Sequence, residues 1–236
     1  MRQLYIFFLL VAFSAAFAQP EKIKADNINS IKIFGPFKVT LIKADASRAE
    51  IDYQDVDSED VSISCDKGNL QIKLRTRSFF DFNDERYRHR SRTYATVKIY
   101  YTSLDNIEAR AGAIIRSSET INAKNLALTS KMGADIRLDI KAEELTLDSS
   151  MGSEVELRGS AKTAAIKSKM GSHVNASKLQ SQNMTVSSSM GSDVSVFAEQ
   201  LLDASADFGA TISYTGNPAH KSTSRFLGAE INPSRK

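Results

Sequence analysis

The sequence predicts an all-β fold, a right-handed parallel β-helix (β-solenoid) with coils of about 19 residues. One observation is a Met-Gly-Ser or Met-Gly-Ala phrase that occurs four times, with its glycines at positions 133, 152, 171 and 191. A fixed period in this range is typical of repeat architectures. The other observation is that apolar and polar residues alternate between these phrases with the period of two that strands show.

Alignment of the repeats on their glycines places similar residues in the same columns. The interior columns are Leu126, Leu145, Ala164, Met184 and Leu202, then Leu128, Leu147, Ile166, Val186 and Ala204, and after the glycine Ile136, Val155, Val174, Val194 and Ile212. Gly and Ser interrupt the alternation once per repeat, which indicates a corner. The sequence lacks both the apolar spacing of a helical repeat and the six-residue sub-periods of a left-handed β-helix.

One further column holds Met132, Met151, Met170, Met190 and Phe208. Continued through the corner, the alternation predicts that these side chains point into the core. The alternative is a copper-binding or oxidant-sensing ladder, because thioethers are soft ligands. The Phe in the last repeat fits packing better than ligation, which favours the core interpretation.

Four segments are expected along the chain. Residues 1–18 have the features of a secretory signal peptide: a basic start, an apolar run and an Ala-Phe-Ala cleavage site. Residues 19–103 are expected to form a β-rich N-terminal cap or first coils, residues 104–216 the regular solenoid, and residues 217–236 a C-terminal cap and tail. We therefore expect an exported protein, in the periplasm, on the outer membrane surface or secreted, without a transmembrane segment.

Composition and charge restrict the possible partners. The chain is 42% hydrophobic and 25% charged, as ordinary globular proteins are. Its net charge of +3, which the loss of Arg2 with the signal peptide lowers by one, predicts no general attraction for nucleic acid. With Cys65 as its single cysteine, the chain cannot form an internal disulfide.

Two groups of residues are candidate ligand-binding sites. The first is the column after the corner, Asp135, Glu154, His173 and Asp193, which we expect to project outwards about 4.8 Å apart. Such oxygen and nitrogen ligands can bind calcium. Carboxylates at exposed turns are common, however, so we expect a solvated column with no cofactor and keep calcium as the alternative.

The second candidate is the loop at residues 75–94, which interleaves arginines with aromatic residues. Such a loop can bind polyanions or stack on sugar rings. A long connection held by its own aromatic side chains is the alternative. The arginines proposed to contact a ligand are Arg86, Arg88, Arg90 and Arg92.

Three stretches resemble a known family. They are "INSIKIFGPFKVTLIKA", the repeated Ser/Gly turns followed by Asp or Glu, and "LLDASADFGATISYTGNP". The chain is similar over about residues 27–231 to the putative auto-transporter adhesin, head GIN-domain family of bacterial cell-envelope proteins. The resemblance implies a β-helix at the envelope and brings no catalytic residues with it. The sequence departs from the family at the four repeat methionines, where many members have Gly.

The function expected from these features is that of an exported, non-enzymatic adhesin or structural module. Its partner would be a glycan or a cell-surface protein, and the sequence does not determine its oligomeric state. The alternative is a pectinase-like enzyme acting on polysaccharides, since some β-helices host such enzymes. A groove holding two carboxylates about 5–10 Å apart would identify an enzyme.

Overall fold

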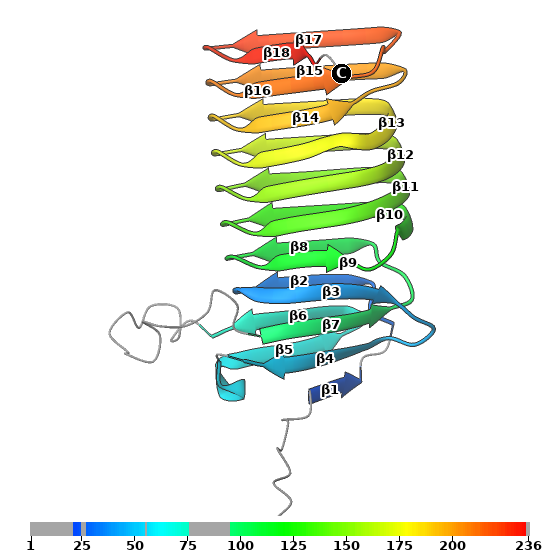
Figure 1. Cartoon of the computed structure of the whole chain (residues 1–236), viewed down its shortest axis with the longest axis vertical. Coiled ribbons are helices and arrows are strands. Elements are labelled where there is room, and N and C mark those ends of the chain that lie inside the picture. Colours follow the sequence, from blue (N-terminus) through cyan, green and yellow to red (C-terminus); the bar gives the residue numbers. More distant parts are fainter. Residues whose placement is uncertain (1–20, 25–26, 55, 76–94, 235–236) are drawn as a thin grey trace, which may run out of the picture.

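A computed structural model describes residues 21–24, 27–54, 56–75 and 95–234. Strands make up 72% of the described residues, which contain no α-helix, and the strands stack into a solenoid of about seven turns with coils of about 19 residues (Figure 1). This confirms the predicted all-β solenoid. The predicted signal peptide lies outside the described residues.

The upper coils form a parallel stack in which every strand pairs with its equivalent one coil away. Four long strands bend around the side opposite the Met-Gly corners, while the other coils use two shorter strands (Figure 1). The parallel pairing continues past residue 216 for one more coil. The strands are β8 (Asn106–Arg110), β9 (Ile114–Ser117), β10 (Ile121–Lys131), β11 (Asp135–Ser150), β12 (Glu154–Lys169), β13 (His173–Ser189), β14 (Asp193–Phe197), β15 (Leu201–Asp207), β16 (Thr211–Thr215), β17 (His220–Phe226) and β18 (Glu230–Pro233).

The N-terminal strands do not stack in sequence order. They are β1 (Glu21–Lys24), β2 (Ser30–Phe34), β3 (Phe37–Lys43), β4 (Arg48–Tyr53), β5 (Val61–Asp66), β6 (Asn69–Leu74) and β7 (Ala95–Tyr101), with a 3-10 turn at Ser58–Asp60. β2 and β3 lie between the coil of β6 and β7 and the coil of β8 and β9. At the lower end, β1 pairs with β4, β4 with β7 and β5 with β6, all antiparallel. These pairs cover the edge that the last parallel coil would otherwise leave open.

The core consists of the predicted apolar columns, which run up the inside of the stack. All residues of the three interior columns are at most 2% exposed. Since equivalent residues are paired in register, each buried side chain packs on its counterpart in the next coil. The alternating pattern therefore predicted the core correctly on both strands of the coil.

The methionine column is exposed, and its predicted place in the core is wrong. Met132, Met151, Met170 and Met190 are 43–52% exposed, and Phe208 is 52% exposed. Each repeat methionine has a positive φ, between 55° and 60°, and is followed by a glycine that also has a positive φ. Two consecutive left-handed residues, as in a type I′ turn, reverse the direction of the side chains. The alternation therefore breaks at the methionine, which points outwards.

Serines occupy the inside of the same corners. Ser130, Ser149, Ser168 and Ser188 are buried, as are Ser153, Ser172 and Ser192. In three of these corners two hydroxyl groups lie 2.8 Å apart, and the second also contacts a carbonyl oxygen of the coil before it, whereas Ser130 donates to the Ala134 carbonyl. This serine ladder supplies polar partners where the strands are interrupted, as buried backbone groups require.

The one coil of 20 residues contains a local irregularity. Val155 pairs with Val174 at a spacing of 19, but Arg158 pairs with Lys178 at a spacing of 20. The extra residue lies in β13, where the Ser177 amide and hydroxyl both donate to the Asn175 side-chain oxygen. Beyond this bulge the register is restored, so the insertion leaves the columns above it aligned.

Candidate functional site

The predicted acidic column is assembled by the strand register. Asp135 pairs with Glu154, Glu154 with His173, and His173 with Asp193, each at the start of a strand directly after a corner. Asp135 is largely covered, with a side chain 22% exposed, whereas the side chains of Glu154, His173 and Asp193 are about half exposed. The column therefore projects outwards, as expected.

Arginines that the sequence analysis did not single out neutralise the lower part of this column. Arg116 contacts the Asp135 carboxylate at 2.5 Å, and Arg137 lies 3.4 Å from its other oxygen. Arg137 also contacts Glu154 at 3.1 Å. Because Arg137 lies between two carboxylates of adjacent coils, it relieves the repulsion that stacked like charges would cause.

The ion pairs extend one position further along the strands. Arg158 donates two hydrogen bonds to Glu156, at 2.6 and 3.0 Å, and Arg137 lies 3.9 Å from the same carboxylate. The hydrogen bond from Arg158 lowers the pKa of Glu156, and the positive charges of Arg158, Arg137 and Lys178 add to this effect against a smaller opposing contribution from burial. Glu156 is thus held as an anion within a row of fixed charges.

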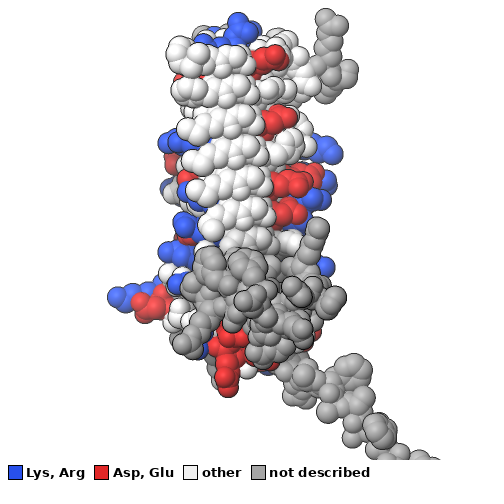
Figure 2. Space-filling model, turned by 90° about the vertical axis from the view of Figure 1, so that its left-hand side faces the viewer, with Lys and Arg blue, Asp and Glu red and all other residues white. Residues whose placement is uncertain are grey.

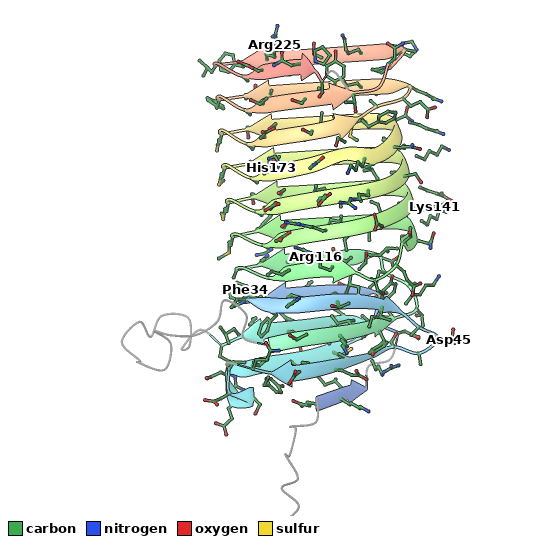
Figure 3. All side chains as sticks on the ribbon, in the orientation of Figure 1. Phe34, Asp45, Arg116, Lys141, His173 and Arg225 are labelled. Atoms are coloured by element: carbon green, nitrogen blue, oxygen red, sulfur yellow. The ribbon has the colours of Figure 1, made fainter. Side chains whose placement is uncertain are left out.

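The upper part of the column is open. His173 Nδ1 lies 3.8 Å from an Asp193 oxygen, and both side chains face solvent. His173 lies on this outer surface, three coils above Arg116 (Figure 3). In the part of the chain that the structure describes, no three His, Cys, Asp or Glu side chains converge as a metal site would require. The solvated column stays the prediction and calcium its alternative, which a shift in melting temperature on addition of calcium would support.

The arginines border a hollow on this face of the solenoid. Its volume is about 250 Å³, and its lining combines guanidinium and carboxylate groups: Arg116, Ser117, Arg137, Leu138, Asp139, Glu156 and Arg158. Such a surface offers hydrogen-bond donors and acceptors side by side. Vicinal hydroxyl groups can accept from a guanidinium while they donate to a carboxylate, so the hollow is chemically suited to a sugar. We name it the arginine hollow.

Two neighbouring columns of the aligned repeats could have predicted this hollow. Arg116, Arg137 and Glu156 share the column two residues after the acidic one. Residues two apart on a strand lie on the same face, so opposite charges in these two columns lie next to each other. A column that mixes Arg with Glu does not stand out as a column of like residues does.

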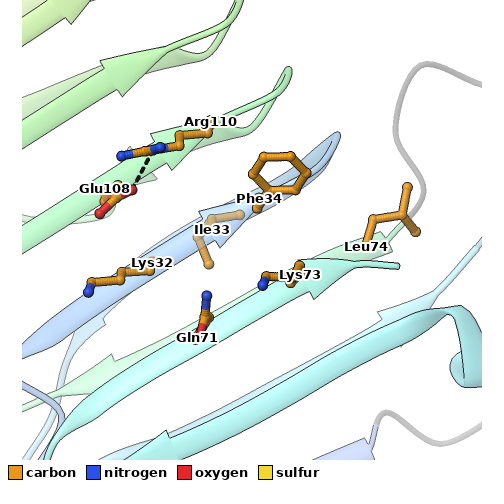
Figure 4. Close-up of a pocket in the computed structure, with 8 residues that line it drawn as sticks. All are labelled: Lys32, Ile33, Phe34, Gln71, Lys73, Leu74, Glu108 and Arg110. Carbon is orange, nitrogen blue, oxygen red and sulfur yellow. Dashed lines mark ion pairs between the residues drawn. The ribbon is translucent and has the colours of Figure 1, made fainter. Parts of the chain in front are cut away.

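The predicted Arg86, Arg88, Arg90 and Arg92 lie outside the described residues. Beside the ends of that segment is a second hollow, of about 260 Å³, over β2, β6 and β8 (Figure 4). Phe34 lies between Lys73 and Arg110 of the adjacent strands, and Arg110 forms an ion pair with Glu108. This hollow has a basic and aromatic lining of the kind the sequence predicted for the loop.

The comparisons agree with this architecture. The family model described as "putative auto-transporter adhesin, head GIN domain" matches residues 27–218. The chain belongs to this family. Among the described residues, no helix has the length and apolar character needed to cross a membrane. Among curated proteins, no relative matches the sequence.

Three solved structures share the fold. A putative adhesin from Bacteroides fragilis has 19% identity and a TM-score of 0.77, over 90% of this chain and 95% of its own. A putative lipid binding protein from Parabacteroides distasonis has 18% identity and a TM-score of 0.68, over 93% and 98%. A putative adhesin from Parabacteroides merdae has 13% identity and a TM-score of 0.62, over 92% and 96%. At these identities the similarity concerns the fold alone.

Proposed function

We propose that this head GIN-domain protein is an exported, non-enzymatic adhesin that binds a glycan of the cell envelope or of another cell surface through the arginine hollow. The observation that carries the proposal is the row of alternating guanidinium and carboxylate groups from Arg116 to Arg158. The strand ladder holds these groups in place, so little side-chain ordering remains to be done when a ligand binds.

Extended chains suit such a surface. The same strand face continues upwards with Asn175, Ser195 and Ser213, one residue per coil. A polysaccharide lying along the stack would form many weak polar contacts instead of entering one deep pocket. Affinity would then rise with chain length, as it does for multivalent ligands.

The enzyme alternative is not supported. The Glu156 carboxylate accepts hydrogen bonds from Arg158, which lower its pKa and favour its ionised form over the protonated acid that glycoside hydrolysis needs. The family and two of the three solved structures described above are named as putative adhesins. A surface protein remains the second partner class, since the same groups can recognise a polar protein surface.

A glycan array probed with the purified chain tests the proposal, together with a pull-down from bacterial and host cell surfaces. We expect a set of oligosaccharides to bind, with stronger signals for longer chains. Capture of a protein, with an empty array, would replace the glycan by a protein partner. If both experiments came back empty, the adhesin proposal would be overturned.

A further inference from the structure

The exposed methionines form a single column along the corner edge of the solenoid. Four of the six methionines of the chain, Met132, Met151, Met170 and Met190, occupy equivalent corners of four consecutive coils. This edge faces the viewer in Figure 2, where an uncharged ridge runs up the stack between charged flanks. Among the described residues, the remaining methionine, Met184, is fully buried in the core.

Methionine is an unfavourable residue at these corners for two reasons. A left-handed backbone conformation costs a residue with a side chain about 1–2 kcal/mol, whereas glycine adopts it freely. The side chains also leave apolar surface in water, about half exposed in each case. The equivalent corners at Ala111, Phe208 and Leu227 have the same left-handed backbone, so what sets these four apart is an unbroken run of exposed thioethers.

The backbone fixes the distance between neighbouring thioethers. The Gly133 amide donates to the Met151 carbonyl at 3.0 Å, Gly152 donates to Met170 at 3.1 Å, and Gly171 donates to Met190 at 3.0 Å. Adjacent corners are therefore stacked at the strand spacing of about 4.8 Å. With φ values of 55–60°, the four methionines leave the backbone in nearly the same direction.

We propose that adjacent methionines of this column bind a soft monovalent cation, copper(I) or silver(I), between their sulfur atoms. Thioethers are soft ligands that select copper(I). Zinc–thiolate bonds are about 2.3 Å long, and two metal–sulfur bonds of about this length on either side of an ion span about 4.6 Å, close to the coil spacing. Four thioethers in line provide two such pairs, Met132 with Met151 and Met170 with Met190.

The surroundings of the column are compatible with a cation. Three residues beyond the methionines lie Asp135, Glu154 and Asp193, of which Asp135 and Glu154 are paired with arginines and Asp193 faces solvent beside His173. Lys131 and Lys169 precede two of the methionines, and Lys131 is paired with Asp148 at 2.8 Å. The column ends in Ala111 below and Phe208 above, neither of which can bind a metal.

Silver(I) is the probe for the test, because it needs no reductant. It is titrated by calorimetry and native mass spectrometry into the chain carrying Cys65→Ala, which removes the competing thiol. We expect two ions per chain. In a variant with all four methionines changed to Leu, which keeps the apolar ridge, we expect both ions to be lost while the circular dichroism spectrum is unchanged.

Two double variants distinguish a paired site from isolated thioethers. M132L/M151L keeps the neighbouring Met170 and Met190, whereas M132L/M170L keeps two methionines separated by one coil. We expect one ion in the first variant and at least about tenfold weaker binding in the second, since a single thioether is a weak ligand. Equal binding by the two double variants, or silver binding that survives in the quadruple Leu variant, would overturn the proposal.

Discussion

The hydroxyl groups of Ser168 and Ser172 lie 2.8 Å apart, fully buried inside one corner of the solenoid. The Ser172 oxygen also accepts a hydrogen bond from the Lys169 amide at 3.2 Å and lies 3.1 Å from the Ser149 carbonyl of the preceding coil. One hydroxyl group thus links the two arms of a corner and joins successive coils. The equivalent contacts recur in the corners before and after it.

Ser172→Ala is therefore expected to lower the free energy of unfolding by about 1–3 kcal/mol, the cost of leaving buried polar groups without a partner. Urea denaturation followed by circular dichroism measures the change. The control is Ser195→Ala, on the outer face, which is expected to stay within about 0.5 kcal/mol of the unmodified chain. A loss in Ser172→Ala no larger than that of the control would show that the serine ladder does not stabilise the corners.

Gly159 and Gly171 are expected to differ in their sensitivity to substitution by Ala. A Cβ on Gly159 would lie 2.0 Å from the Ile140 carbonyl oxygen, whereas a Cβ on Gly171 would meet no atom within 4 Å. We expect Gly159→Ala to destabilise the chain by more than about 3 kcal/mol or to prevent folding, because the backbone of β11 has to shift. Gly171→Ala is expected to cost only about 1 kcal/mol, the left-handed penalty. Comparable melting temperatures for the two variants would contradict this packing.

Substitution of a corner methionine tests the backbone strain at that position. Met170 has φ 55° and its side chain faces solvent. Met170→Gly is expected to leave stability unchanged or to raise it by up to about 1 kcal/mol, because glycine adopts this conformation without strain. Met170→Val is expected to lower it by about 1–2 kcal/mol, since a β-branched residue tolerates a positive φ poorly. Thermal unfolding of both variants checks the order, which would be reversed if this side chain packed in the core.

Stability should depend on pH through Glu156. Its folded pKa is lowered, first by the hydrogen bond from Arg158, so its ionised form is stabilised by folding. This contribution is complete above the unfolded pKa of about 4.3 and disappears as the pH falls through the folded value. Between pH 6 and pH 3, Glu156→Gln is therefore expected to lose less stability than the unmodified chain. Glu143→Gln, at an exposed position outside the arginine row, serves as the control; identical pH profiles for all three proteins would contradict the pairing.

The repeat period and the alternation predicted the coil length and the buried columns, because the interior of a solenoid repeats in register. They did not predict the direction of the corner methionines. An alternating pattern assumes extended backbone, and Met170 followed by Gly171 departs from it with two positive φ values. The glycine signalled a turn but not that its predecessor shares the left-handed conformation.

The acidic column was predicted from its like residues, and its neutralisation was not. Arg116 meets Asp135, and Arg137 meets Glu154, across the strand ladder between coils, whereas the Arg158–Glu156 pair lies within one strand. The stacking order of the N-terminal strands could not be predicted from the sequence either. The insertion of β2 and β3 between later strands depends on long-range pairing that no local pattern records.

The arginine hollow is the proposed ligand-binding surface. Its most direct test is a calorimetric titration of the best oligosaccharide from the glycan array into three proteins: the unmodified chain, Arg137→Ala/Arg158→Ala, and Arg225→Ala as a control in the last coil, remote from the hollow. Loss of a charged hydrogen-bonding group costs about 1.5–3 kcal/mol. We expect at least about tenfold weaker binding by the double variant and unchanged binding by the control. Equal affinities for all three proteins would contradict the proposal.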